Sequence, residues 1–321
     1  MAHQLESMFS VIETPWHGLG KIVREAPTAA DAIKLAGLDW NVSKRPVKVV
    51  NPDGSESEAK GFVAIVRDSD QTVFNVLGEG FTPLQNSKVF DFFNPFIEAG
   101  LASFETAGSL RGGRNVWALA KLNKAPIEVG KGDAVNKFLL LSNGHDGTMA
   151  CRVGFTPIRV VCANTLAAAH GAQASKLVRL MHSKNVATNV EKLREIINAA
   201  DAKFEATAEQ YRELARRDVH RGDLRKYVNI VFGFSEIEDE RRQLAQKKTL
   251  ESIERLFTQG RGMNLKSAKG TYWGLYNAVT EYLSYESGRS EDRRLYSLWF
   301  SQSARINQRA LHTAMEMARV A

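Results

Sequence analysis

All eight prolines of this chain lie in its first half, and Pro157 is the last of them. Proline interrupts helices because it lacks an N–H donor and clashes with the preceding turn. The apolar residues also change from a spacing of two to helical spacing once the chain has passed Lys176. We therefore predict an α+β fold, in which an N-terminal antiparallel β-sheet with crossing helices (1–180) precedes a mostly helical C-terminal region (181–321).

Local signals place the elements of this fold. Gly-Gly between two apolar runs predicts a hairpin of residues 101–110 and 115–122. Alternating residues predict further antiparallel strands at 61–66 and 72–77. Thr28 is suited to cap a helix over 29–38. The expected later helices cover 84–99, 190–217, 221–232, 240–258, 270–285 and 292–320, the last with a break near Ser301.

One stretch gathers features that could form a functional centre, KFLLLSNGHDGTMACRVGFTPIRVVCANTL from Lys137 to Leu166. It predicts a buried strand at 138–141, a polar glycine-containing turn at 143–147 and a β-branched strand at 158–162. Only here do apolar runs, an ionisable turn and paired arginines fall within about thirty residues. A functional centre is therefore expected in this stretch.

Composition bounds the class of protein and its partners. The chain is 44% hydrophobic and 25% charged, which is typical of a globular protein rather than a disordered one. A net charge of +7 permits binding to a polyanion but does not require it. No secretory signal is visible, and no apolar run approaches the ~20 residues that span a bilayer. We expect a cytoplasmic protein without a membrane partner.

The tip of the predicted hairpin carries two arginines, Arg111 and Arg114, on either side of Gly-Gly. A solvated turn accounts for these residues, and so does a basic finger that contacts phosphates. Trp117 follows three residues after Arg114, where an aromatic ring could stack on an unpaired base.

Catalytic and metal-binding patterns are weak. A zinc site would need four N or S ligands, and the candidates Cys151, Cys162, His145 and His170 include no Cys-x-x-Cys pair. We therefore predict no metal and no cofactor, with both cysteines packed in strands. His145 and Asp146 are expected to shape an exposed turn rather than to act as acid and base, so His145→Ala should change stability by at most about 1 kcal/mol.

Four segments carry a resemblance to a known family: ETPWHGLG (13–20), GEGFTPLQN (78–86), HDGTMACRVGFTPIRVVCANTL (145–166) and YWGLYNAVTEYLSY (272–285). The chain resembles, over nearly its whole length, the phage/plasmid-like proteins that carry domain of unknown function 932. Such proteins occur in phage, plasmid and prophage settings, often near replication and recombination genes. By analogy, the β-sheet-plus-helix layout and basic surface are similar to those of phage single-strand annealing proteins.

These observations together favour non-sequence-specific binding of single-stranded DNA, with strand annealing in recombination or replication as the wider role. The alternatives are a metal-dependent nucleic-acid-processing enzyme that uses His145 and Asp146, and a non-catalytic scaffold or host-interaction protein. Aromatic residues of the C-terminal region could form a core or a homo-oligomer interface. The predicted DNA-binding residues are Arg111, Arg114, Trp117, Lys137, Arg152, Phe155 and Arg159.

Overall fold

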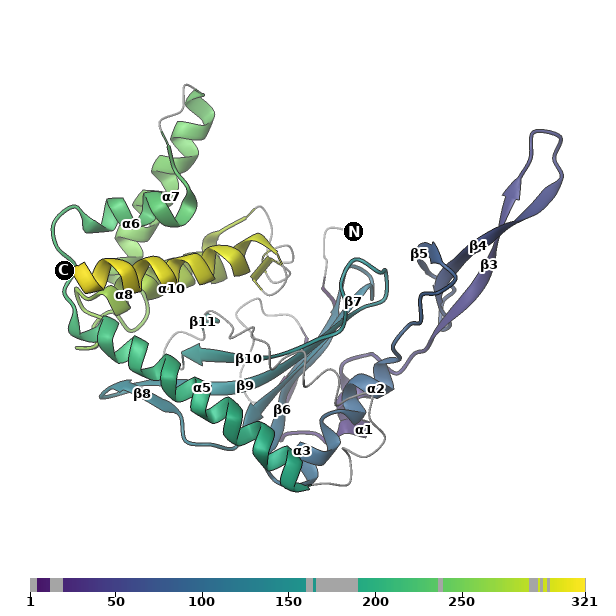
Figure 1. Ribbon diagram of the computed structural model, residues 1–321, viewed down its shortest axis with the longest axis horizontal. Helices are drawn as coiled ribbons and strands as arrows, with labels where there is room; N and C mark the ends of the chain where they lie inside the picture. The colour runs from purple at the N-terminus through teal and green to yellow at the C-terminus, as the bar shows by residue number, and fades with distance from the viewer. Residues whose placement is uncertain are drawn as a thin grey trace. The chain divides into compact units, whose positions relative to one another are not determined.

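The computed structural model describes residues 5–11, 20–159, 164–165, 190–235, 239–288, 294, 297–298 and 301–320 (Figure 1). Strands dominate before residue 166 and helices after residue 189, so the predicted α+β class is confirmed. The chain divides into two compact units. The first holds the described residues of 1–123, 139–154 and 170–196, and the second holds those of 124–138, 155–169 and 197–321. The predicted boundary between residues 180 and 181 lies outside the described residues.

The larger sheet has eight strands in the order β11-β10-β9-β7-β6-β1-β2, and β8 pairs with β9. The pairs β1–β6, β6–β7, β8–β9 and β10–β11 are antiparallel, whereas β1–β2 is parallel. Strands β9 and β10 each contribute residues to both units. The bounds are β1 Leu5–Val11, β2 Lys21–Val23, β6 Ala102–Leu110, β7 Asn115–Leu122, β8 Ile127–Gly130, β9 Asp133–Gly144, β10 Arg152–Arg159 and β11 Asn164–Thr165.

A separate three-stranded sheet, which we call the arm, belongs to the first unit (Figure 1). It consists of β3 (Val42–Val50), β4 (Glu56–Arg67) and β5 (Val73–Gly78), all antiparallel. β4 pairs with β5 only from Phe62 onward, so the remainder of β3 and β4 forms a two-stranded ribbon. This arrangement confirms the predicted antiparallel strands of the region.

Three short helices complete the first unit: α1 (Ala29–Leu35), α2 (Asn86–Asp91) and α3 (Asn94–Glu98). The Thr28 hydroxyl accepts from the Asp31 amide, so the predicted cap is confirmed. The single helix expected over 84–99 is wrong, because Pro95 starts a new helix. Proline fits the first turn of a helix but would break the interior of a longer one.

The described helices of the second unit agree with the spacing of apolar residues. They are α5 (Val190–Arg216, with its first residues in the other unit), α6 (Asp223–Phe232), α7 (Glu240–Gln259), α8 (Tyr272–Glu281), a π-helical turn η1 (Tyr282–Glu286) and α10 (Gln302–Val320). No described helix is both long enough and apolar enough to cross a bilayer.

Aromatic residues form the core of the second unit. The rings of Tyr211 and Trp273 lie 4.7 Å apart, and both side chains are fully buried. The Tyr276 hydroxyl donates to Asn307 Oδ1, and the Tyr227 hydroxyl donates to the backbone carbonyl of Ala310. The described C-terminal aromatics at this centre therefore build an intramolecular core, which was one of the two expectations for them. Tyr296, Trp299 and Phe300 lie outside the described residues.

Candidate nucleic-acid interface

The predicted basic tip is fastened to its own unit. Arg111 adopts a positive φ of 56°, is half-buried, and lies 3.3 Å from the Asp146 carboxylate. Arg114 donates to the backbone carbonyls of Phe74 and Val73 on β5. Both guanidinium groups therefore hold the hairpin turn against neighbouring residues of the same unit. The prediction that they form an exposed basic finger is wrong, and their role is structural.

The two predicted stacking residues are core residues. Trp117 is 1% exposed in β7, and Phe155 is 6% exposed in β10. The Phe155 ring makes an edge contact with Phe204 of α5, with their centroids 5.8 Å apart. A base cannot reach either ring without opening the core, so these two residues are corrected to packing roles.

Lys137 is also inaccessible. Its side chain is 3% exposed, and Nζ lies 2.6 Å from Asp201 Oδ1 and 3.2 Å from Glu205 Oε1. A buried ammonium group needs such partners because desolvation of an unpaired charge is costly. Lys137 therefore stabilises the packing of α5 on β9 instead of meeting a phosphate. Arg152 and Arg159 begin and end β10, and their side chains lie outside the described part of the chain, so their role stays a prediction.

His145 is a buried residue and not part of an exposed turn. Its ring stacks on Phe74 with centroids 5.7 Å apart and lies 5.3 Å from the Trp40 ring. Nε2 is 2.9 Å from Asn86 Oδ1. The Asn86 amide donates to the backbone carbonyls of Leu38 and Trp40, so its oxygen must accept and His145 Nε2 must carry the proton. Nδ1 has no hydrogen-bond partner among the described residues.

Asp146 is buried beside it and has the predicted turn geometry. Its Oδ1 accepts from the Thr148 amide and hydroxyl, at 3.1 and 2.6 Å.

Burial raises the pKa of the Cys151 thiol to about 11, so this cysteine stays protonated and unreactive. Among the residues described, no three potential ligand side chains are grouped to hold a metal ion. Cys162 and His170, the other candidates considered as ligands, lie outside those residues.

Removal of the His145 side chain should cost more stability than an exposed position would. We expect His145→Ala to lower the free energy of unfolding by about 2 kcal/mol, because Asn86 Oδ1 loses its donor and a cavity forms between two aromatic rings. Denaturant unfolding monitored by circular dichroism measures this change. His312→Ala, at a side chain that is 74% exposed, should change stability by under about 0.5 kcal/mol. Equal effects of the two substitutions would contradict the burial of His145.

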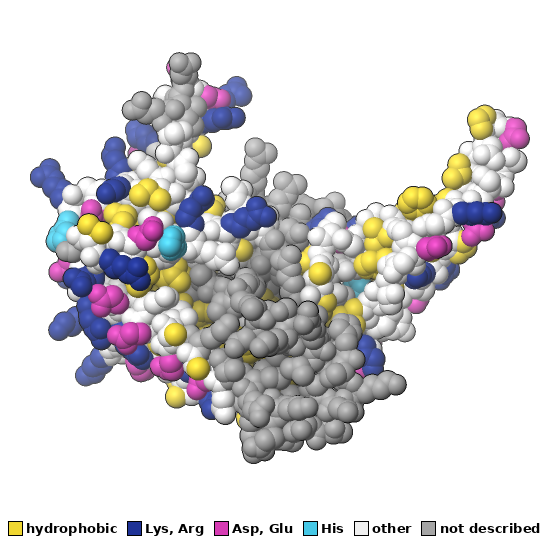
Figure 2. Space-filling view, viewed as in Figure 1, with side chains coloured by type: hydrophobic (Ala, Val, Ile, Leu, Met, Phe, Trp, Pro, Cys, Tyr) yellow, Lys and Arg dark blue, Asp and Glu magenta, His cyan; other side chains and the backbone are white. Residues whose placement is uncertain are grey.

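Exposed positive charge gathers on the second unit. Between residues 239 and 269 the sequence has eight Lys and Arg against four Asp and Glu, and all eight basic side chains are exposed. Figure 2 shows Lys and Arg side chains distributed over the helices of this unit. The eight residues are Arg241, Arg242, Lys247, Lys248, Arg255, Arg261, Lys266 and Lys269.

Three of these residues form a row along α7. Arg241, Lys248 and Arg255 follow at intervals of seven residues, which is nearly two full turns, so they lie on one side of the helix and each is about 10.5 Å along the axis from the next. Ile253 and Leu256 are buried on another side of α7, and they fix which side faces solvent. We call Arg241, Lys248 and Arg255 the α7 row.

Beyond the C-terminal end of the α7 row, Arg261 stacks on an aromatic ring. Arg255 pairs with Glu286, and the Arg261 guanidinium lies 4.2 Å from the centre of the Tyr285 ring. Tyr285 and Glu286 belong to the π-helical turn η1. Such turns insert an extra residue at an energetic cost and are frequent at functional sites. Exposed positive charge and a half-exposed aromatic ring are therefore side by side.

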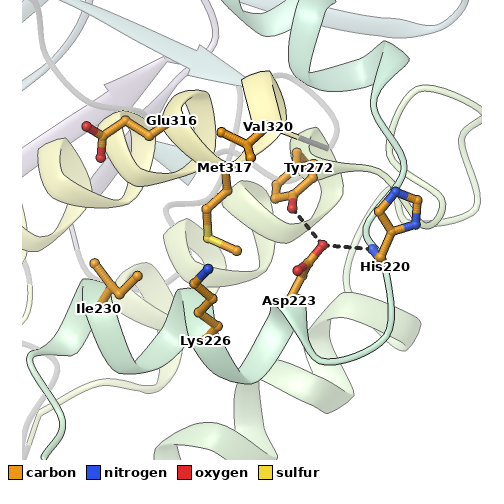
Figure 3. Close-up of a pocket in the computed structure, with 8 residues that line it drawn as sticks. All are labelled: His220, Asp223, Lys226, Ile230, Tyr272, Glu316, Met317 and Val320. Carbon is orange, nitrogen blue, oxygen red and sulfur yellow. Dashed lines mark hydrogen bonds between the residues drawn. The ribbon is translucent and has the colours of Figure 1, made fainter.

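A second feature of this unit is a cavity of about 400 Å³ beside α6 and α10 (Figure 3). Asp223 Oδ2 accepts from the Tyr272 hydroxyl at 2.8 Å and from the His220 amide at 3.0 Å. Burial, reinforced by the Asp223 carboxylate, raises the pKa of Tyr272, so its hydroxyl stays a donor. The remaining walls mix both charges with apolar groups, which favours no single ligand class: Lys226, Ile230, Glu316, Met317 and Val320.

Comparison with known proteins places the chain in a family. The family model described as a domain of unknown function, DUF932, matches residues 73–299, which is more than two thirds of the sequence. The chain belongs to the DUF932 family. No curated protein and no solved structure matches this DUF932 chain. The matched residues include β5, the larger sheet from β6 onward and the α7 row.

The α7 row was not predicted from the sequence, because the paired arginines and the ionisable turn that suggested a site lie within residues 137–166. Its signal was nevertheless present, since the residues at positions 241, 248 and 255 are all basic and the predicted helix of 240–258 places them on one side.

Proposed function

We propose that this DUF932 protein binds single-stranded DNA without sequence specificity, through the α7 row and the basic loop that follows α7, which carries Arg261, Lys266 and Lys269. One observation carries the proposal: every Lys and Arg between residues 239 and 269 is exposed, and acidic residues there are half as many. Lys and Arg that neutralise phosphates release condensed counterions, which supplies most of the affinity of sequence-independent binding.

The geometry suits an extended strand. The row places three cations along about 21 Å of α7, as a backbone laid parallel to the helix would require. At the C-terminal end of α7, the Tyr285 ring and the Arg261 plane offer flat surfaces for bases. Stacking of this kind tolerates any base and needs it to be unpaired, which favours single strands over duplexes.

Strand annealing is the wider activity that we infer, in recombination or replication of a phage or plasmid in the cytoplasm. Two complementary strands repel one another through their phosphates, and a basic surface that neutralises one strand weakens this repulsion. Contacts to the backbone and to the faces of the bases would leave the base edges open for pairing.

Neutralising the row should weaken binding and reduce its salt dependence. We expect the triple variant Arg241→Gln, Lys248→Gln and Arg255→Gln to bind a labelled oligodeoxynucleotide about 100-fold more weakly at ~0.1 M salt. The slope of log K against log salt should become shallower by about 2, at ~0.7 for each lost contact. Fluorescence anisotropy across a salt series measures both quantities.

The matched control removes three charges that are also exposed, on α10: Arg305→Gln, Arg309→Gln and Arg319→Gln. This variant should keep the wild-type slope. Equal losses in both triple variants would place binding elsewhere, and no binding by the wild type at low salt would rule out the proposed function. Loss of labelled strand when Mg²⁺ or Mn²⁺ is added would favour the nucleic-acid-processing enzyme instead.

A further inference from the structure

The arm exposes apolar side chains on one face. Paired residues of antiparallel strands share a face, and so do alternate residues of one strand. Ala64 pairs with Arg45 and Val76, and Phe62 is two residues before Ala64, so these four residues share the outer face. Phe62 is 56% exposed and Val76 is 44% exposed. Apolar side chains are also visible along the arm in Figure 2.

This concentration is unusual within the described chain. Nine large apolar side chains are exposed among the described residues, and five of them lie in the arm. Scattered exposed apolar residues are normal on proteins, whereas a contiguous group marks an interaction surface. The five are Val49, Val50, Phe62, Val73 and Val76. Val49 and Val50 are consecutive residues of β3, so they point to opposite faces, and the contiguous group on the outer face is that of Phe62, Ala64 and Val76.

The arm does not need its outer face for its own stability. Its inner face already has a core of Val42, Ile65 and Phe74, all of which are under 5% exposed. The surrounding inner residues are Trp40, Val63, Leu77 and Phe81. The outer apolar residues are therefore available for a partner.

We expect a partner on the outer face of the arm rather than at its edge strands, because backbone groups of both edge strands, β3 and β5, already have hydrogen-bond partners. On the β5 edge, Arg114 takes the carbonyls of Val73 and Phe74. On the β3 edge, the Gln85 side chain binds both the amide and the carbonyl of Val42. Such capping prevents another strand from extending the sheet at these positions.

Charge argues for a second copy of the chain as the partner. The arm, from residue 42 to 79, has five basic and six acidic residues, although the whole chain carries +7. A surface with balanced charge does not attract the phosphate backbone of a nucleic acid. In a two-fold contact each patch meets itself, so a strongly charged patch would repel its copy, whereas a balanced apolar patch can pack.

We propose that the outer face of the arm is a self-association surface that docks on the same face of a second copy of this chain. The twelve residues of β4 span about 40 Å, and three strands are about 14 Å wide, which limits the contact to roughly 500 Å² per copy. Stable interfaces bury about 800 Å² per partner, so we expect a weak dimer with a dissociation constant in the micromolar range.

Sedimentation equilibrium over a wide concentration range tests this proposal. The wild type should approach twice its 35.6 kDa chain mass at high concentration. The double variant Phe62→Ser and Val76→Thr should raise the dissociation constant at least 10-fold. Val76→Lys should do the same without removing Phe62, because a two-fold contact brings the two new charges together. Unchanged circular dichroism would show that the arm variants are folded.

The control removes two equally exposed apolar side chains outside the arm, with Ile22→Thr and Leu244→Ser. It should dimerise like the wild type. A wild type that stays monomeric at every concentration would overturn the proposal, and so would equal weakening by the control pair. Because no nucleic acid is present, the result does not depend on the proposed DNA binding.

Discussion

Trp273→Ala should lower the free energy of unfolding of the second unit by about 3–5 kcal/mol, which is usual for a fully buried tryptophan. Its ring contacts those of Tyr211 and Tyr276, with centroid distances of 4.7 and 5.9 Å. Its Nε1–H also donates to Asp133 Oδ2 at 2.9 Å. Truncation therefore removes ring packing and one of the hydrogen bonds of a buried carboxylate.

The hydrogen bond to Asp133 adds to the stability that Trp273 contributes through packing. Its side chain is fully buried, and the same oxygen accepts from the Ser267 hydroxyl at 2.6 Å. A buried carboxylate is stabilised by such donors, and removing one of them costs more than removing a neutral bond. Trp273→Phe, which keeps most of the ring but not the N–H, should cost about 2 kcal/mol, intermediate between the wild type and Trp273→Ala.

Chemical denaturation followed by tryptophan-independent far-ultraviolet circular dichroism measures both variants. Leu244→Ala is the control, because Leu244 is 53% exposed on α7 and its truncation should change stability by less than about 0.5 kcal/mol. A loss below about 1 kcal/mol in Trp273→Ala would contradict the central place of this residue in the core.

The secondary structure followed from local signals in the sequence. The Gly-Gly turn of the β6–β7 hairpin requires positive φ, and Gly112 and Gly113 have φ of 64° and 82°. The spacing of apolar residues placed α7 at 240–258, and the structure has it at Glu240–Gln259. These features depend on neighbouring residues, which a sequence displays directly.

Burial of the predicted site residues could not be seen in the same way. The partners of Lys137 lie 64 and 68 residues later in the sequence, so a lysine in a strand gives no local sign of its ion pairs. For Trp117 the sequence did carry a local sign of burial, which the prediction of a stacking role did not use. The run Val116 to Ala120 is continuously apolar, a pattern typical of strands that are buried on both faces.

The second prediction with a large effect is that the first unit loses stability as the pH falls. Between pH 6.5 and about 4 we expect the first unit to lose up to about 3 kcal/mol of its free energy of unfolding through His145. Burial lowers the pKa of His145 from its ordinary 6.5 to about 4, and the nearby Asp146 carboxylate opposes this only in part. The unfolded chain therefore binds a proton in this range that the folded chain does not, so stability falls as pH falls.

The pH range separates His145 from the carboxylates that the fold also perturbs. The pKa of Asp70 is lowered by its hydrogen bond from Arg67, and that of Glu209 by hydrogen bonds from Arg216 and Arg212. Their ordinary values are 3.8 and 4.5, so the stability that they contribute is lost only below those values. The loss between pH 6.5 and 4.5 can therefore be assigned to a histidine.

His145→Gln identifies that histidine, because the glutamine amide can still donate to Asn86 Oδ1 but cannot titrate. Denaturant unfolding at a series of pH values should show a slope in the wild type and a nearly flat line in this variant between pH 6.5 and 4.5. His312→Gln, at an exposed histidine, should keep the wild-type slope. If the slope persists in His145→Gln, protonation of another group drives the acid loss, and the neutral state of the buried His145 ring does not set the acid limit of the fold.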